Sequence, residues 1–243
     1  MNWIFPIAGF GTRTSKLGEY KPLIEVFKNQ SILKICLSGL KTMFNPEDVF
    51  VFICSEEQSS KFNVREKISA IFDELELKVN WNLIEIDSTP NGQALTLKKA
   101  VSKIKLSGNT IVINSDQFIY FDYNSIDLDS NGVGLYFNDN SSSCFYELDI
   151  KNRKVLDIQE KISISHYASA GVYYFSEYDD ILKCINWGID TEQYYSDELY
   201  LGPCMKYFED LKYFKMDMKF DLGTVNNIDR FKNFWYSGIQ SVK

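Results

Sequence analysis

The sequence predicts an α/β protein with a doubly wound, mostly parallel sheet. Continuous apolar runs alternate with segments of helical periodicity through the first half of the chain, as in sheets whose strands are buried on both faces. The second half carries shorter segments of alternating polarity, which are typical of antiparallel strands. A hydrophobic content of 45% over 243 residues supports a sizeable core. We therefore expect one domain, residues 1–243, with a Rossmann-like half at 1–125 and an antiparallel half at 126–243.

The first half should contain four buried strands with amphipathic helices between them. Pro6 falls inside the first apolar run, and because proline cannot donate to a sheet, that strand should either end near Pro6 or be paired on one side only there. Ser31 is a suitable N-cap for the first helix. The expected strands are Trp3–Ile7, Val49–Ile53, Trp81–Ile86 and Thr110–Asn114, and the expected helices run from Ser31 to Leu40, from Glu56 to about Leu75 and from Gly92 to Ile104.

The second half should contain short strands followed by helices. A turn at Lys151–Arg153 separates two of the strands. Thr224 is a suitable N-cap for the last helix. The expected strands are Gly132–Phe137, Cys144–Ile150, Lys154–Glu160 and Ala168–Phe175, and the expected helices are Glu177–Asn186, about Asp197–Leu211 and a final helix ending near Phe234.

Composition excludes several classes of protein. A net charge of −7 argues against a general nucleic-acid binder, which needs clustered Lys and Arg. The five cysteines are scattered singly without a CxxC pair, as expected of reduced core thiols. No apolar stretch approaches the length of a membrane span. We expect a cytoplasmic monomer or homodimer with no nucleic-acid or membrane partner.

A glycine-rich run follows the first strand and is a candidate for binding phosphate. Gly9 and Gly11 have no Cβ, so backbone N–H groups there can face phosphate oxygens. Arg13 is a forked donor and Lys21 a mobile point charge, and Pro22 should hold Lys21 in extended backbone at the start of a strand. The run matches neither the dinucleotide fingerprint nor the Walker pattern. The candidate nucleotide-binding residues here are Ala8, Gly9, Phe10, Gly11, Thr12, Arg13 and Lys21.

Two aspartates follow apolar segments, where strands are expected to end. Asp116 comes directly after the buried run at 110–114, and Asp221 follows Phe220 and precedes Leu222-Gly223-Thr224. A hard dication could gather carboxylate and phosphate oxygens at such strand ends. The alternative is that either aspartate caps a turn or a helix.

These segments resemble the sugar-phosphate nucleotidyltransferases, enzymes related to glucose-1-phosphate thymidylyltransferase and to cytidylyltransferases. The family's N-terminal pattern runs G-x-G-T-R through a short insertion to P-K-P-L, and Tyr20 here replaces its first proline. Further matches follow in the family's order and approximate spacing, so the resemblance covers nearly the whole chain. They are Asn91–Ala94, Asn114–Asp116, Gln159–Lys161, Ala170–Tyr173 and Asp221–Thr224.

The resemblance implies a nucleotide subsite and a metal. Asp116 and Asp221 would hold Mg²⁺, and Arg13 and Lys21 would act on the triphosphate. The turn formed by Asn91, Gly92 and Gln93 would place the nucleobase, with Gln93 as the candidate for base contact.

The resemblance also implies an acceptor subsite in the second half. Glu160 would hold acceptor hydroxyls and Lys161 the acceptor's phosphate, while Gly171 would let the acceptor approach the backbone. Ser115 is a further candidate for reading acceptor hydroxyls. Ile162 stands where the family usually has proline, which puts the local backbone geometry in question.

The implied activity is transfer of a nucleoside monophosphate from an NTP to a sugar 1-phosphate, with release of pyrophosphate, for surface polysaccharide or capsule synthesis. A pyrimidine base is weakly favoured. The alternatives are cytidylyl transfer to a phosphocholine-like or other small phosphate, a glycosyltransferase, and a non-catalytic nucleotide-binding relative. A glycosyltransferase of similar fold would carry Asp-x-Asp, whereas Gln117-Phe118 follow Asp116 here. The single histidine, His166, is expected at the surface rather than in a zinc site.

Overall fold

Four parallel strands form the N-terminal half of a nine-stranded sheet. The structure is a computed structural model that describes residues 1–9, 20–138 and 143–240. The order of the strands in this sheet is β5-β4-β1-β6-β11-β8-β14-β10-β9. The parallel strands β5 (Asn80–Ile86), β4 (Val49–Ser55), β1 (Asn2–Pro6) and β6 (Thr110–Ile113) confirm the four predicted ones. The strand β1 ends at Pro6, as the missing N–H donor required.

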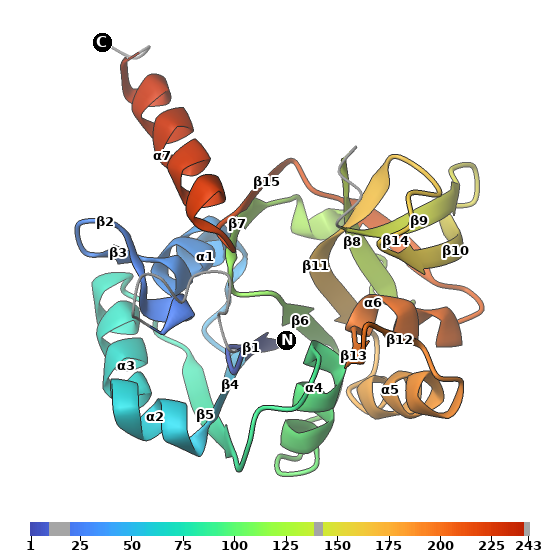
Figure 1. Cartoon of the computed structure of the whole chain (residues 1–243), viewed down its shortest axis with the longest axis horizontal. Helices are drawn as coiled ribbons and strands as arrows, with labels where there is room; N and C mark the ends of the chain where they lie inside the picture. Colours follow the sequence, from blue (N-terminus) through green and yellow to red (C-terminus); the bar gives the residue numbers. More distant parts are fainter. Residues whose placement is uncertain (10–19, 139–142, 241–243) are drawn as a thin grey trace.

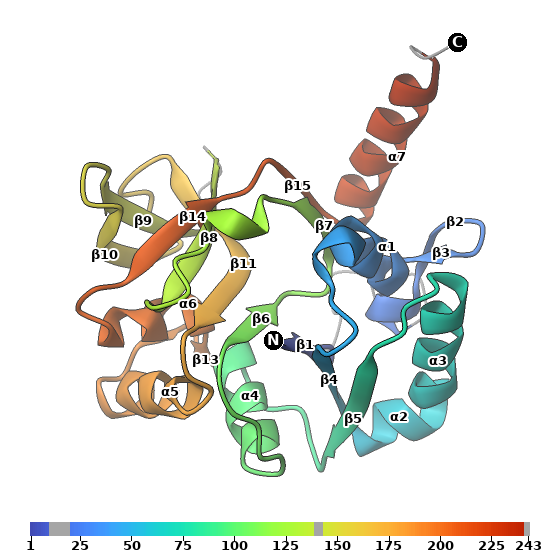
Figure 2. The ribbon, with the colours of Figure 1, turned by 180° about the vertical axis from the view of Figure 1, so that it is seen from behind.

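Helices cover both faces of the parallel strands, which confirms the doubly wound arrangement (Figures 1 and 2). Side chains alternate along β1, so Trp3 and Phe5 face one layer and Ile4 the other. The first layer packs against α1 (Ile32–Leu40) and α3 (Val64–Glu74), and the second against α4 (Gln93–Val101) and α5 (Asp180–Asp190). The Ser31 hydroxyl caps α1 by accepting from the Lys34 N–H.

The C-terminal half continues the same sheet in mixed, largely antiparallel pairing. Strand β11 (Tyr167–Phe175) runs antiparallel to both β6 and β8 (Gly132–Phe137), and β14 (Lys212–Lys215), β10 (Lys154–Glu160) and β9 (Cys144–Asp149) follow. One further pairing, Ala168 with Phe145, links β11 to β9. Because of this pairing, the five strands β11, β8, β14, β10 and β9 close into a ring. The ring was not predicted from the sequence.

The last part of the chain returns to the N-terminal half. Strand β15 (Met218–Asp221) pairs with β7 (Gln117–Tyr120). The end of a strand at Asp221 confirms the prediction, whereas β7 was not predicted. The helix α7 (Val225–Gln240) follows, with the Thr224 hydroxyl accepting from the Asn227 N–H at 3.2 Å, and it extends beyond Phe234. It packs beside α1 and the hairpin of β2 (Glu25–Phe27) and β3 (Gln30–Ser31), then projects from the body (Figure 1).

Several helix predictions need correction. The expected helix from Glu56 to Leu75 is two helices, α2 (Glu56–Phe62) and α3, because Asn63 between them has a left-handed φ of 50°. The helix expected at about Asp197–Leu211 is wrong. That segment holds the hairpin of β12 (Tyr194–Tyr195) and β13 (Glu198–Leu199), the short α6 (Leu201–Cys204) and the 3₁₀ helix η5 (Met205–Tyr207), since Ser196 and Asp197 have positive φ.

Other predicted helices are present with slightly different bounds. The helix α4 ends at Val101 rather than Ile104, and α5 begins at Asp180 rather than Glu177. Three further 3₁₀ helices are η2 (Lys21–Leu23), η3 (Lys41–Met43) and η4 (Tyr123–Ser125). All five cysteines are buried free thiols, as predicted. Within the described ranges, every helix is too short or too polar to cross a bilayer.

Candidate active site

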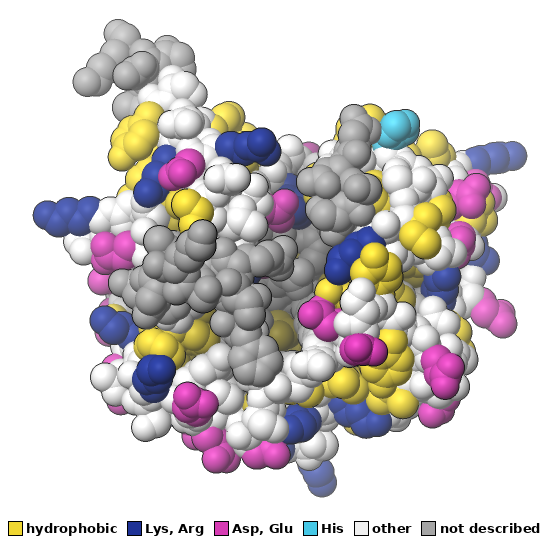
Figure 3. All heavy atoms as spheres, viewed as in Figure 1, with side chains coloured by type: hydrophobic (Ala, Val, Ile, Leu, Met, Phe, Trp, Pro, Cys, Tyr) yellow, Lys and Arg dark blue, Asp and Glu magenta, His cyan; other side chains and the backbone are white. Residues whose placement is uncertain are grey.

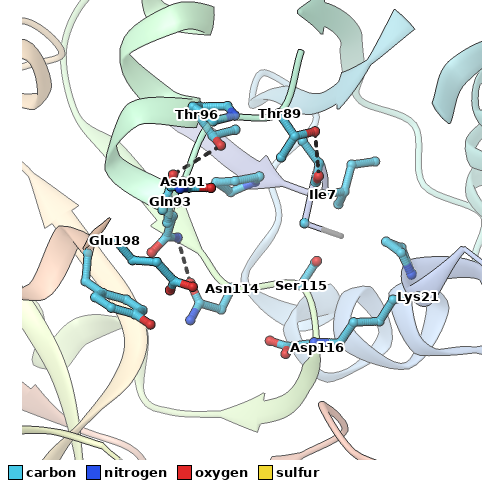
Figure 4. Close-up of a pocket in the computed structure, with 17 residues that line it drawn as sticks. Ile7, Lys21, Thr89, Asn91, Gln93, Thr96, Asn114, Ser115, Asp116 and Glu198 are labelled. Atoms are coloured by element: carbon cyan, nitrogen blue, oxygen red, sulfur yellow. Dashed lines mark hydrogen bonds and ion pairs between the residues drawn. The ribbon is translucent and has the colours of Figure 1, made fainter. Parts of the chain in front are cut away.

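A pocket of about 330 Å³ opens where β1 and β6 end. Parallel strands bring their carboxyl ends to one edge of a sheet, so segments far apart in sequence meet there (Figure 4). Most of the lining comes from the N-terminal half, but Glu198 and Tyr200 come from the C-terminal half. The N-terminal lining is Pro6–Gly9, Lys21, Pro22, Thr89–Gln93, Thr96 and Asn114–Asp116.

The Lys21 ammonium and the Asp116 carboxylate form an ion pair in this pocket, with Nζ 2.5 Å from Oδ2 (Figure 4). Lys21 lies in the 3₁₀ turn η2, so its expected place in a strand is wrong; Pro22 supports the first turn of η2 instead. Tyr20 replaces the family's proline, and its hydroxyl donates to the Ile7 carbonyl at the end of β1. This bond ties the Lys21 turn to the strand end, so Lys21 is held beside the pocket. Of the predicted phosphate-binding run, residues 10–13 (Phe10, Gly11, Thr12 and Arg13) lie outside the described residues.

Asp221 ends a strand, as expected, but its carboxylate does not line the pocket. Its Oδ1 accepts from Lys219 Nζ at 2.5 Å, and its side chain is half exposed. Its backbone nevertheless neighbours that of Asp116, because the next residue, Leu222, donates its N–H to the Asp116 carbonyl at 2.8 Å. The structure thus brings the two aspartates together at the level of the backbone.

The carboxylates present fit a magnesium ion shared with a substrate. Mg²⁺ usually takes one or two protein carboxylates and completes its shell with phosphate and water oxygens. Asp116 supplies one carboxylate in the pocket, and Asp221 supplies a second on the adjoining strand. Over residues 1–9, 20–138 and 143–240, no group of three or more His, Cys, Asp and Glu side chains gathers as a metal centre.

The predicted base-binding turn lines the opposite side of the pocket. Gln93 donates its side-chain N–H to Asn114 Oδ1 at 2.6 Å, which fixes its amide beside β6 (Figure 4). Gly92 has a φ of 104°, and a Cβ there would lie 2.4 Å from the Leu199 carbonyl oxygen. Only glycine combines that φ with so close an approach. Gly92 therefore lets the β13 backbone of the second half pack directly on the turn.

Two residues that sequence reasoning missed hold the start of the glycine run. The Ala8 carbonyl accepts from Gln58 Nε2 at 3.1 Å and from the Thr89 hydroxyl at 2.9 Å. Gln58 also completes a capping box with Ser55 at the start of α2. That Ser-x-x-Gln spacing was a readable signal for the helix start, but nothing in it indicated the contact with Ala8.

Lys161 lies outside the pocket lining, close to two tyrosine rings, and one of these tyrosines, Tyr200, lines the end of the pocket that the second half forms. Its Nζ donates to the Tyr200 hydroxyl at 3.1 Å and lies 4.8 Å from the Tyr200 ring centroid and 4.6 Å from that of Tyr195. Its φ is 55°, far from the extended backbone that a following proline favours, so Ile162 matches the geometry. Tyr195, Tyr200 and Glu198 were not predicted, because a helix was expected over most of this segment.

Glu160 lies beside Lys161 but outside the lining of the pocket. Burial raises the pKa of its carboxyl, while the Cys144 thiol and the Lys161 charge oppose that shift and the charge of Glu198 adds to it. The carboxyls of Glu160 and Glu198 are therefore close enough to influence each other.

Gly171 has a packing role in the structure. Its φ is 65°, and a Cβ there would lie 2.4 Å from Asn114 Nδ2. Its carbonyl accepts from the Asn114 N–H at 2.8 Å. Gly171 thus makes room for Asn114, and its contact with an acceptor stays a prediction. Ser115 is buried and lines the pocket, whereas His166 is exposed and stacks on Phe137, as a surface residue would.

The structure superimposes on solved nucleotidyltransferases over nearly its whole length. A nucleoside-diphosphate-sugar pyrophosphorylase from Vibrio cholerae RC9 matches with a TM-score of 0.81 and 20% identity, over 94% of this chain and 98% of that one. A UDP-glucose pyrophosphorylase complexed with UDP-glucose matches with a TM-score of 0.74 and 15% identity, over 98% of both chains. An inositol-1-phosphate CTP transferase from T. maritima matches with a TM-score of 0.69 and 13% identity, over 93% of this chain and 90% of that one.

No protein-family model matches the chain, and no curated protein sequence matches it. At these identities the structural likeness shows the fold. The chain has the fold that these sugar-phosphate nucleotidyltransferases share, as the resemblance of its motifs predicted.

Proposed function

We propose that this chain transfers a nucleoside monophosphate from an NTP to a small phosphorylated acceptor, with a sugar 1-phosphate as the leading class. The observation that carries the proposal is the pocket itself. One end holds the Lys21–Asp116 pair and is lined by Ala8 and Gly9, and the other is lined by residues of the second half, of which Tyr200 contacts Lys161. Two substrates could therefore meet in one cavity, with Lys21 lining one end and Lys161 bonded to Tyr200, which lines the other.

The reaction needs no protein nucleophile. A phosphate monoester has a second pKa near 6 and is largely dianionic at neutral pH. One of its oxygens attacks the α-phosphorus, a new P–O bond forms, and the bond from that phosphorus to the bridging oxygen breaks. Pyrophosphate leaves with the electron pair, and the product is a nucleotide-activated compound.

The protein's own residues align the reactants and stabilise charge. Lys21 stands at the phosphate end, where its ammonium can pass from Asp116 to the triphosphate. Gln93 and Asn91 would hold the base, and Lys161 the acceptor phosphate. Mg²⁺ would be held by Asp116 and Asp221 and would neutralise phosphate charge.

A pyrophosphate-release assay tests the proposal. The four ribonucleoside triphosphates and dTTP are each combined with a panel of sugar 1-phosphates and of non-sugar phosphates, with Mg²⁺ present. We expect release that requires both substrates, and an Asp116→Asn preparation serves as the control for contaminating enzymes. Nucleotide binding without turnover on any acceptor would point to a non-catalytic relative. Use of a non-sugar phosphate above every sugar would replace the sugar class and leave nucleotidyl transfer in place.

A further inference from the structure

The Asp221 carboxylate lies outside the pocket and is held by a lysine of its own strand. Its Oδ1 is 2.5 Å from Lys219 Nζ, just as Asp116 Oδ2 is 2.5 Å from the Nζ of Lys21. The proposed function assigns both aspartates to one Mg²⁺, but only Asp116 lines the pocket. The Asp221 carboxylate therefore has to leave Lys219 before it can serve there.

The two members of the Lys219–Asp221 pair differ in exposure. The Asp221 side chain is 51% exposed, whereas the Lys219 side chain is 5% exposed. A cation can therefore reach the carboxylate from solvent, while the ammonium stays enclosed. The Lys219 Nζ also lies 4.1 Å from the ring centroid of Tyr136 on β8, and the faces of aromatic rings attract cations. Lys219 thus keeps a stabilising neighbour when the carboxylate turns away.

A buried amide beside Asp221 lacks a partner. Gln117 is 2% exposed, and within the part of the chain that the structure describes its Nε2 has no hydrogen-bond partner. Gln117 lies directly opposite Asp221 in the β7–β15 pair, so the two side chains share a face with their Cβ atoms about 5 Å apart. Lys219 lies opposite Ile119, two residues farther from Asp116. A carboxylate that turns from Lys219 toward Gln117 therefore turns toward Asp116, and it satisfies the buried donor.

Charges of both signs are interspersed on the surface of the molecule. On the described residues of the face in Figure 3, Lys and Arg side chains lie among Asp and Glu side chains. Neighbouring opposite charges cancel at a distance, and salt at about 0.1 M screens exposed charges beyond about 10 Å. The affinity for a metal ion should therefore depend mainly on competition at the two carboxylates.

We infer that Lys219 is a positioning residue that takes the place of the metal at Asp221 when no metal is bound, and that Gln117 receives the carboxylate when it turns. The inference deepens the proposed function and rests on the metal site within it. The Lys219 ammonium competes with the metal ion, while the Gln117 amide and the Tyr136 ring favour the metal-binding position of the carboxylate. Lys219 therefore lowers the affinity for metal, and the other two residues raise it.

Binding of Mn²⁺ to the whole chain tests these signs. Mn²⁺ takes the same oxygen ligands as Mg²⁺, and electron paramagnetic resonance follows the free ion. With and without a non-hydrolysable NTP analogue, Lys219→Met should tighten Mn²⁺ binding roughly tenfold. The matched control is Lys215→Met, at an exposed lysine 5.7 Å from the Tyr167 ring centroid, and it should keep the wild-type affinity. In an Asp221→Asn background, Lys219→Met should have no effect, because the carboxylate for which it competes is absent.

Variants of the other two residues should weaken Mn²⁺ binding. Tyr136→Leu removes the ring face and should weaken binding roughly two- to tenfold, whereas Tyr136→Phe keeps the ring and the wild-type affinity. Gln117→Leu should weaken binding roughly tenfold and also raise the midpoint of urea denaturation, because an apolar group of similar size replaces an unpaired buried donor. A merely structural role of Gln117 predicts no such gain of stability together with loss of metal affinity.

Turnover is measured separately, so that the inference and the proposed function can fail independently. Unchanged or weaker Mn²⁺ binding by Lys219→Met would overturn the inference, and so would an equal gain in the Asp221→Asn background; pyrophosphate release by the wild type would then leave nucleotidyl transfer in place. The expected changes of affinity in a protein without turnover on any acceptor would reject the enzyme and keep the inference. Absence of Mn²⁺ binding by the wild type with the NTP analogue would overturn both the inference and the metal site.

Discussion

The two ends of the pocket are built from different kinds of structure. The Lys21–Asp116 end lies at the carboxyl ends of β1 and β6, two parallel strands that are buried on both faces. The Lys161 end is built from the residue after β10 and from the β12–β13 hairpin, and Lys161, Ser196 and Asp197 all have positive φ. The first end is fixed by a core, and the second by turns in a conformation that non-glycine residues seldom adopt.

The contrast between the two ends indicates which part of such a site can be varied. Segments that leave a packed sheet are held by the core whatever their own residues, so the phosphate end is constrained by the fold. A two-residue hairpin turn is held by few contacts and can change its side chains with little effect on the core. Acceptor choice should therefore lie in the hairpin, and nucleotide chemistry at the strand ends.

The largest effect should come from the phosphate end. Asp116→Asn and Asp221→Asn should each lower the rate of pyrophosphate release by about 10³-fold or more with Mg²⁺, because a carboxylate ligand would be lost. EDTA should abolish the wild-type rate, and added Mg²⁺ should restore it. Urea denaturation checks that the variants are folded. A wild-type-like rate in either variant would remove that aspartate from the site.

Substitutions of the two lysines should have different kinetic effects, one on the nucleotide and one on the acceptor. Lys21→Ala should lower kcat and weaken NTP binding, whereas Lys161→Ala should mainly raise the KM for the acceptor, each by roughly 10- to 100-fold. Calorimetry with the NTP alone and steady-state kinetics measure the two effects. If Lys161→Ala abolished NTP binding in the absence of acceptor, the division into two subsites would be wrong.

Substitutions at two glycines test how tightly the chain is packed around the pocket. Gly92→Ala and Gly171→Ala should each lower the free energy of unfolding by about 1–3 kcal/mol, because both need a positive φ and a Cβ at either would lie 2.4 Å from another atom. The Gly92 variant should lose more free energy of unfolding than the Gly171 variant, since its added Cβ meets the Leu199 backbone rather than the Asn114 side chain. Gly108→Ala isolates the cost of φ alone, because a Cβ there meets nothing within 4 Å. Equal losses in all three variants would contradict the packing argument.

The smallest effect concerns stability at alkaline pH. Burial raises the pKa of the Cys54 thiol to about 11 and that of Cys204 to about 12, from an ordinary 9.0. In the unfolded chain these thiols therefore lose their protons at a lower pH than in the folded protein. The free energy of unfolding should fall as pH rises above 9, by up to about 1.4 kcal/mol per pH unit for each thiol. Urea denaturation with a reductant, from about pH 8 to about pH 10, measures the slope. Cys54→Ala and Cys204→Ala should each flatten it, and an unchanged slope in both would exclude these thiols as its source.

Elements with a strong local pattern were predicted well. The buried runs at Val49 and Thr110 form the predicted strands, and Ser31 caps the predicted helix. The strand β7 has a weak pattern and was missed, because it forms by pairing with β15 across a large separation in sequence. Only the end of β15 at Asp221 was predicted. The helix expected at Asp197–Leu211 failed because the turn at Ser196 and Asp197 reverses the chain there.

The doubly wound sheet and the place of Asp116 at its edge could be predicted from the sequence alone, because apolar periodicity and a strand's end are local properties that burial enforces. The sequence also indicated Lys21, although Lys21 lies in a 3₁₀ turn rather than at the start of a strand. It also indicated Lys161 and Gly92 as residues of interest. The folded chain was needed to show that Glu198 and Tyr200 line the pocket, that Asp221 pairs with Lys219, and that Gly92 and Gly171 serve close packing. Apart from the Asp221–Lys219 pair, which lies within one strand, these relations join segments from distant parts of the chain. Such contacts depend on how the whole sheet and its hairpins pack rather than on any local pattern.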